Sequence, residues 1–207
     1  MNVPDRWQRL PWQLRYRTGP RWASELRRRV ILATHRHCHV EFRGPVRLGP
    51  GFALDISGDG TFIVGKAVDF RRDFVCEISG SGRVTIGDFT TFTYNSVIQC
   101  TTSIDVGSGC SLGSVLLADG NHRFRDFDRP MKEQGYDHRP LRIGDGAVVM
   151  SNCVVLADIG DRAVVGANSV VTRPVPPYCL AVGAPARVVE YFGPPDLYPA
   201  DLDLPAR

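Results

Sequence analysis

Lysine is almost absent from this 207-residue chain, because Lys66 and Lys132 are the only two among 25 basic residues. This is a composition bias and carries no functional cue. The chain also lacks any run of about 20 uncharged apolar residues, so we expect neither a membrane-spanning helix nor a signal peptide. Its six cysteines contain no CxxC pair. We therefore expect a cytoplasmic protein with reduced core or surface thiols.

Charge is unevenly distributed. The net charge is +3, but residues 1–39 hold nine arginines against Asp5 and Glu25, which gives +7 there and leaves −4 for the rest. A basic segment can contact anionic lipid or nucleic acid. Apolar and aromatic residues interleave with these arginines, which favours a solvated helix face. We expect no nucleic-acid partner and keep membrane-surface contact as the lesser alternative.

The two ends of the chain differ from its middle. Residues 1–39 form a basic, partly helical segment, and Pro20 suits a helix start. Residues 193–207, rich in proline and aspartate, are expected to be a flexible tail. Between them, residues 40–192 form one domain whose last part, from residue 174, is a cap. The helical stripe of the N-terminal segment consists of Trp22, Leu26, Arg29 and Val30.

Apolar residues recur with a period of six in the middle of the chain. A period of six is neither the helical 3.6 nor the alternation of a two-faced sheet. It is typical of hexapeptide repeats, which stack as a parallel β-helix. We therefore predict an all-β fold of this kind. The series is Ile86, Phe92, Ile98, Ile104, Cys110 and Leu116.

Six aliphatic–glycine steps mark the corners of the predicted stack. They are Leu48-Gly49, Val64-Gly65, Ile86-Gly87, Val106-Gly107, Ile143-Gly144 and Ile159-Gly160. The intervals between them are 16, 22, 20, 37 and 16 residues, against about 18 for a coil of three hexads. We interpret two coils as enlarged at a corner and two as shortened. The longest interval predicts a protruding polar loop over residues 118–140, where function is expected.

The C-terminal half carries a family resemblance. Ile143-Gly-Asp-Gly146, the run IGDRAVVGANSVVTRPVPP from Ile159, and Gly183-Ala-Pro-Ala-Arg187 resemble the hexapeptide-repeat acyltransferases. That group includes the maltose and galactoside O-acetyltransferases and the polysaccharide O-acetyltransferases. The loop also matches, through Asp119-Gly-Asn-His122, Phe127, Pro130 and Gln134-Gly135. The resemblance is strong over residues 84–190. It implies a left-handed parallel β-helix, a homotrimer, and acetyl-CoA or another acyl-CoA as donor.

His122 is the candidate general base. Histidine titrates near neutral pH, which suits removal of a proton from a hydroxyl. The resemblance gives His122 this role: it deprotonates an acceptor hydroxyl, which attacks the thioester carbonyl. Asp119 is the candidate that orients the imidazole, as carboxylates do in catalytic triads.

Further site residues are implied by the same resemblance. The backbone N–H of Ser151 aligns with the oxyanion donor. Just before it, Val148 stands where the family usually has Trp, and Met150 stands where it has Gly. The missing Trp suggests a larger acyl pocket. The alternative is that its loss is ordinary sequence drift, for which Met150 compensates. The implied donor-binding residues are Met150, Ala167, Thr172, Arg173 and Arg187, and Asn95 is implied in acceptor binding.

Other functions remain open from the sequence. His35-Arg-His-Cys-His39 places three histidines on alternate positions, as on one face of a strand, but a distant fourth ligand is not evident, so we expect no metal. A β-helical carbonic anhydrase needs three converging histidines, and only His138 lies near His122. The favoured function is O-acylation of a sugar or glycan precursor. The alternatives are N-acylation of an amino sugar and a non-catalytic scaffold.

Overall fold

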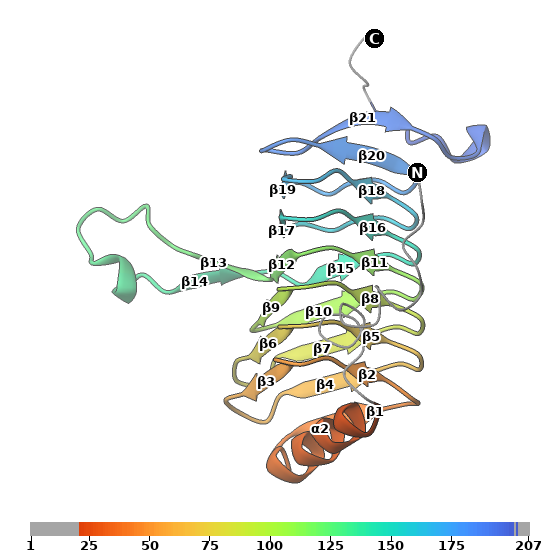
Figure 1. The fold of residues 1–207 in the computed structure, drawn as a ribbon. Helices are drawn as coiled ribbons and strands as arrows, with labels where there is room; N and C mark the ends of the chain where they lie inside the picture. Colours follow the sequence, from red (N-terminus) through yellow and green to blue (C-terminus); the bar gives the residue numbers. More distant parts are fainter. Residues whose placement is uncertain (1–20, 201, 203–207) are drawn as a thin grey trace, which may run out of the picture.

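The computed structural model describes residues 21–200 and 202. The expected helix start at Pro20, and the rest of residues 1–20, 201 and 203–207, lie outside the described residues. The described chain is a column of stacked coils with one helix at its base and a hairpin projecting from its side (Figure 1). The predicted β-helix is confirmed, because three parallel sheets run along the column.

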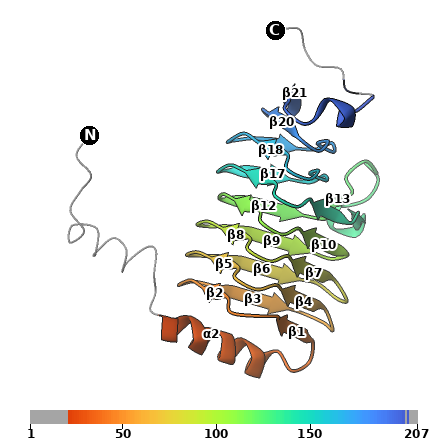
Figure 2. The ribbon, with the colours of Figure 1, turned by 90° about the vertical axis from the view of Figure 1, so that its right-hand side faces the viewer.

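Successive coils add one strand to each sheet, but beyond β15 sheet A continues only as the isolated bridges at Ile159 and Val175 (Figure 2). Sheet A contains β1 (His39–Phe42), β4 (Thr61–Val64), β7 (Arg83–Ile86), β10 (Ser103–Val106) and β15 (Leu141–Ile143). Sheet B contains β2 (Arg47–Leu48), β5 (Asp69–Phe70), β8 (Thr91–Phe92), β11 (Ser111–Leu112), β16 (Val148–Val149), β18 (Val164–Val165) and β20 (Cys179–Val182), and β21 (Arg187–Tyr191) pairs antiparallel with β20. Sheet C contains β3 (Ala53–Ile56), β6 (Val75–Ile78), β9 (Val97–Cys100), β12 (Val115–Ala118), β17 (Cys153–Val155) and β19 (Val170–Val171).

Alternate side chains of every sheet point into the column and form one core. In its lower coils the core is aromatic: Phe70 stacks on Phe92 with ring centroids 5.4 Å apart and contacts Phe74 at 4.5 Å. The six-residue series holds for five members, which are all buried. It is wrong at Leu116, which is only half-buried. The next residue, Leu117, pairs with Ile98 and fills the core, because the coil between these two positions is longer than a set of three hexads.

The strand register also corrects the first predicted coil. Leu48 lies in sheet B and pairs with Phe70, whereas the other five steps lie along sheet A. The interval from Leu48 to Val64 is therefore not a coil. Phe42 pairs with Val64 and Val64 with Ile86, so the first two coils are equal in length and both are enlarged.

The coils after the long loop are the short ones. Ile143 bridges to Ile159 and Ile159 to Val175, so these two coils are equal in length and both are shorter than the coils below the loop. The strands of sheet C shorten in this region, from four residues in β12 to three in β17 and two in β19. The upper part of the column is thus the tighter part.

The Asp or Ser that follows four of the six corner glycines explains the Gly-Asp pattern. The Oδ1 atom of Asp145 accepts the N–H of Ser108 one coil below at 2.7 Å, and Asp161 accepts that of Asp145 at 3.0 Å. The glycine itself is required by this contact. A Cβ at Gly144 would collide with the backbone nitrogen of Asp161.

Helix α2 (Arg21–Thr34) closes the bottom of the column. Its Ile31 and Ser24 are buried, and the Ser24 hydroxyl oxygen accepts the N–H of Leu48 at 2.9 Å. Arg27 donates to the Leu48 carbonyl oxygen at 2.8 Å. No helix among the described residues is long and apolar enough to cross a membrane. The apolar members of the predicted stripe face away from the column: Trp22, Leu26 and Val30.

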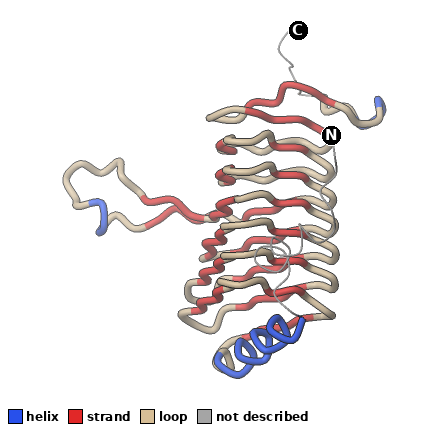
Figure 3. Tube along the Cα trace, in the orientation of Figure 1, coloured by secondary structure: helices blue, strands red, loops and turns tan. Residues whose placement is uncertain are grey.

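The long loop leaves the column between sheets C and A as a hairpin. Its arms are β13 (Gly120–His122) and β14 (Tyr136–His138), paired antiparallel, and its tip holds the 3-10 helix η2 (Met131–Glu133). Figures 1 and 3 show this hairpin well clear of the stacked coils. At the other end of the chain, β21 is the strand of the predicted cap, followed by the 3-10 helix η3 (Pro195–Leu197). The rings of Tyr191 and Tyr198 pack edge to face there, 4.9 Å apart.

Candidate functional site

The base of the hairpin overhangs the outer face of sheet C, and His122 lies there. The side chain of His122 is exposed, and its ring packs on that of Tyr136 across the hairpin, with centroids 4.2 Å apart. Together with outward residues of sheet C, these two rings line a groove of about 660 Å³. The structure thus gives the candidate base an accessible imidazole beside a groove.

The groove has a polar part and an apolar part. Gln99 on β9 donates from Nε2 to Glu77 on β6 at 3.1 Å, and both side chains are exposed. Above them the lining is aliphatic, with Leu116, Val154 and Leu156 half-buried. Such a surface can contact a hydroxylated molecule at one end and an alkyl chain at the other.

Asp119 lies close to His122 in sequence but is used elsewhere. It is 5% exposed, and its carboxylate accepts the N–H of Thr101 at 2.9 Å and that of Thr102 at 2.6 Å. It also accepts the Cys100 thiol at 3.6 Å. Burial, together with the Asp119 charge, raises the pKa of Cys100 to about 12, so this thiol stays protonated. Within residues 21–200, no hydrogen bond joins Asp119 to His122.

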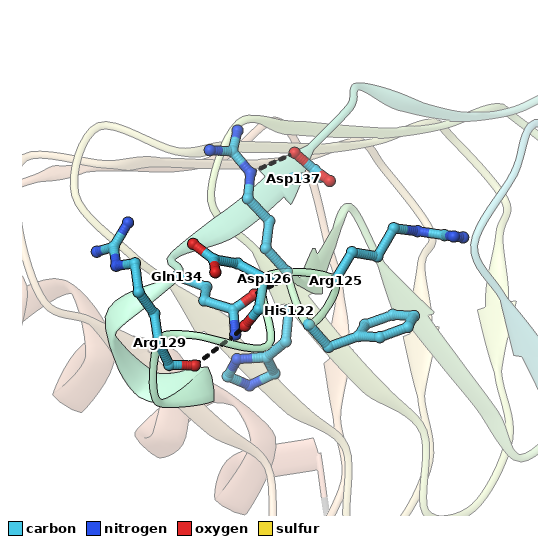
Figure 4. Close-up of a pocket in the computed structure, with 8 residues that line it drawn as sticks. His122, Arg125, Asp126, Arg129, Gln134 and Asp137 are labelled. Carbon is cyan, nitrogen blue, oxygen red and sulfur yellow. Dashed lines mark hydrogen bonds and ion pairs between the residues drawn. The ribbon is translucent and has the colours of Figure 1, made fainter.

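Gln134 holds the outer part of the hairpin together (Figure 4). Its side-chain nitrogen donates to the carbonyl oxygens of Asp126 at 2.7 Å and Arg129 at 2.8 Å, and its side-chain oxygen accepts the Asp126 N–H at 3.1 Å. A second cavity, of about 370 Å³, lies here beside His122. Its basic residues do not converge, because Arg125 and Arg129 extend to opposite sides.

Ser151 lies at the other edge of sheet C, at the corner between sheets B and C that precedes β17. The N–H groups on either side of it are bonded, that of Met150 to Val165 and that of Asn152 to Ser114. The N–H of Ser151 has no acceptor among the described residues. It is therefore available to an oxyanion. Within one chain, the strand length of sheet C separates it from His122.

The residues expected to hold the donor divide between the two edges of sheet C. Met150 and Ala167 are exposed at the same corner as Ser151, on successive coils. Thr172 and Arg173 are exposed at the opposite corner, directly after β19. Arg187 begins β21 on the cap and is also exposed.

Asn95 belongs to the Ser151 corner but to a lower coil. Its φ of 56° places it in a left-handed turn, and its carbonyl oxygen accepts the Ser114 hydroxyl at 3.4 Å. Its exposed side chain faces solvent. The structure does not bring Asn95 together with His122 within one chain, because they lie at opposite corners.

The histidine tract does not lie on one strand face. Residues 35–38 form the turn from α2 to β1, and only His39 is in the strand. The His35 and His37 rings bond to the carbonyl oxygens of Leu54 and Ile56, at 3.1 and 3.0 Å. The described residues contain no group of three or more side chains that could hold a metal ion. All six cysteines are free thiols; five are buried and Cys38 is half-buried.

Sequence reasoning missed Tyr136, Glu77 and Gln99. Glu77 and Gln99 occupy equivalent outward strand positions on successive coils. Their separation equals the interval between the steps at Val64 and Ile86, so the aliphatic–glycine spacing could have paired them. Tyr136 has no such signal. Its place opposite His122 follows from the hairpin register across the connection between β13 and β14.

The chain is similar in sequence to a curated acetyltransferase and in fold to two acetyltransferases of known structure. No family model matches the chain. It is 28% identical to the probable acetyltransferase Rv3034c of Mycobacterium tuberculosis over 185 residues, which are 87% of this chain and 61% of that protein. The chain thus spans less than two thirds of the length of this curated relative.

Two solved structures share the fold. A galactoside acetyltransferase in complex with coenzyme A matches 97% of this chain and 86% of its own, with a TM-score of 0.60 and 19% identity. The hexapeptide-repeat acetyltransferase VCA0836 of Vibrio cholerae, complexed with acetyl coenzyme A, matches 90% of this chain and 85% of its own. Its TM-score is 0.57 and its identity 23%. At these identities the likeness establishes the architecture.

Proposed function

We propose that this chain, which is similar to hexapeptide-repeat acetyltransferases, transfers an acetyl group from acetyl-CoA to a hydroxyl of a sugar or glycan precursor. The observation that carries this proposal is the position of His122. Its imidazole is exposed on the hairpin and lines the groove over sheet C. A general base must lie within hydrogen-bond reach of the acceptor hydroxyl whose proton it removes, and an exposed imidazole beside a groove allows this.

The proposed reaction needs one base and one oxyanion donor. The free ring nitrogen of His122 removes the acceptor's hydroxyl proton while that oxygen bonds to the thioester carbonyl carbon. The Ser151 N–H, which has no acceptor in the described chain, stabilises the resulting oxyanion. The C–S bond then breaks, and the proton on His122 passes to the departing thiolate of coenzyme A.

A homotrimer would bring these two groups together. His122 and Ser151 lie at opposite edges of sheet C in one chain, so a groove between two copies supplies His122 from one copy and Ser151 from the next. In such a groove, Met150 and Ala167 are the residues proposed to contact the pantetheine arm. Arg173 and Arg187 are proposed to bind its phosphates, and Thr172 lies beside them.

The polar end of the groove supports a hydroxylated acceptor. Glu77 and Gln99 present a carboxylate and an amide next to His122, a combination that accepts and donates hydrogen bonds to sugar hydroxyls. A carboxylate would also accept an ammonium group, so an acceptor screen with matched sugars and amino sugars separates O- from N-acylation.

Replacement of His122 by Ala tests the proposal. The variant should lose about 100-fold or more in turnover with acetyl-CoA and a sugar panel, while thermal shifts with coenzyme A stay unchanged. Asp137→Asn, on the same hairpin but paired with Arg123, is the control for altered charge. The same thermal-shift panel should include butyryl-CoA, which binds as well as acetyl-CoA only if the missing Trp enlarges the acyl pocket.

Two results would contradict the proposal. Undiminished turnover by the His122→Ala variant would remove the base from the mechanism. No thermal shift with any acyl-CoA would leave the non-catalytic scaffold as the better explanation.

A further inference from the structure

Three rings lie in a row along the hairpin base. Tyr136 lies directly opposite His122 in the antiparallel register, and their centroids are 4.2 Å apart with the planes at 39°. His138, two residues further along the same arm, stacks on Tyr136 at 5.6 Å and 20°. Tyr136 is thus held between the candidate base and a second histidine.

The opposite arm leaves space for this row. His138 pairs with Gly120, where a Cβ would lie 2.5 Å from the His138 Nδ1 atom. A side chain at Gly120 would therefore displace His138 from Tyr136. The absence of that side chain allows the second histidine to support the tyrosine from behind.

The tyrosine ring is the contact that restrains the candidate base. Within the described part of the chain no hydrogen bond holds the His122 imidazole. The carboxylate best placed in sequence, that of Asp119, is used on the amides of Thr101 and Thr102. An aromatic face also stabilises a neighbouring cation within about 6 Å, which is what His122 becomes after it takes the acceptor's proton.

We propose that Tyr136 is a positioning residue for His122, acting through its ring in place of an orienting carboxylate, with His138 supporting it. This rests on the proposed function, since it assigns a partner to the proposed base. The ring limits how the imidazole can rotate and keeps its free nitrogen directed along the groove. The tyrosine hydroxyl has no part in this role.

Kinetics of two variants test the role of the ring. In Tyr136→Leu, kcat should fall about 10- to 100-fold, because a misplacement of about 1 Å can cost that much. The KM for acetyl-CoA should not change. Tyr136→Phe keeps the ring and should stay within about twofold of the original kcat. Phe192→Leu, an exposed aromatic on the cap, is the control. A Leu variant with full kcat, or a Phe variant as impaired as Leu, would overturn the proposal.

An NMR measurement tests the stack without any reaction. The imidazole signals of His122, assigned by comparison with His122→Ala, should lie upfield under the ring current of Tyr136. They should move downfield in Tyr136→Leu and remain in place in Tyr136→Phe. Unchanged signals in the Leu variant would refute the stack itself. Correct shifts with an active His122→Ala enzyme would instead contradict the proposed function and leave the stack intact.

Discussion

Asp119 is predicted to stabilise the base of the hairpin and not the imidazole. Its carboxylate accepts two backbone N–H groups, from Thr101 and Thr102, in a site where the residue is 5% exposed. Hydrogen bonds to a charged group contribute about 1.5–3 kcal/mol each. Asp119→Ala should therefore lower the free energy of unfolding by about 3 kcal/mol or more.

The size of this effect makes it easy to measure. For a domain of this length, about 1 kcal/mol corresponds to a shift in Tm of roughly 2–4 °C, so the Ala variant should melt about 6–12 °C lower. Scans at one fixed protein concentration exclude a contribution from assembly. Asp119→Asn retains one acceptor oxygen without the charge and should lie between the two. Faster amide hydrogen exchange at Thr101 and Thr102 should accompany the loss.

The same two variants can refute this reasoning. A Tm of Asp119→Ala within about 2 °C of the original would show that the amide contacts contribute little. An Asp119→Asn variant with unchanged Tm but a kcat lowered about 100-fold would instead place the carboxylate on the imidazole of His122, in the orienting role first expected from the sequence.

Two other predictions concern the column and its helix. Gly144→Ala should lower the free energy of unfolding by about 3 kcal/mol in thermal unfolding, because its Cβ would lie against the backbone of the next coil. Gly109, with φ of 68° and open space around it, is the control, and Gly109→Ala should cost about 1 kcal/mol. Equal losses in the two variants would contradict this. Hydrogen bonds donated by Arg28 and, with a smaller effect, by Arg29 lower the pKa of Glu25 from 4.5 to about 2. The contribution of ionised Glu25 to the free energy of unfolding is thus present above pH 4.5 and lost as the pH falls towards 2. In urea titrations at several pH values, Glu25→Gln should lose less stability than the original chain over this range. An equal loss in both would refute the prediction.

The repeat and the position of its interruption were determined by the sequence alone. An aliphatic residue and a glycine recur, mostly with an Asp or Ser after them, because the glycine allows close approach of the next coil and the Asp or Ser accepts an amide of a neighbouring coil, as at Gly144 and Asp161. These are local requirements that any one coil displays. The long interval between Val106 and Ile143 likewise predicts the protruding loop, since a stack of short coils cannot accommodate so many residues without a protrusion.

Only the tertiary structure decided which residues meet. Leu48 and Val64 carry the same step but belong to different sheets, and Leu117 replaced Leu116 in the core, because corner lengths vary between coils and each extra residue shifts the register. The backbone N–H groups that donate to Asp119 lie a full coil away from it in the sequence. The pairing of Tyr136 with His122 depends on hairpin register, which no pattern in the chain specifies and which the fold of residues 118–140 sets.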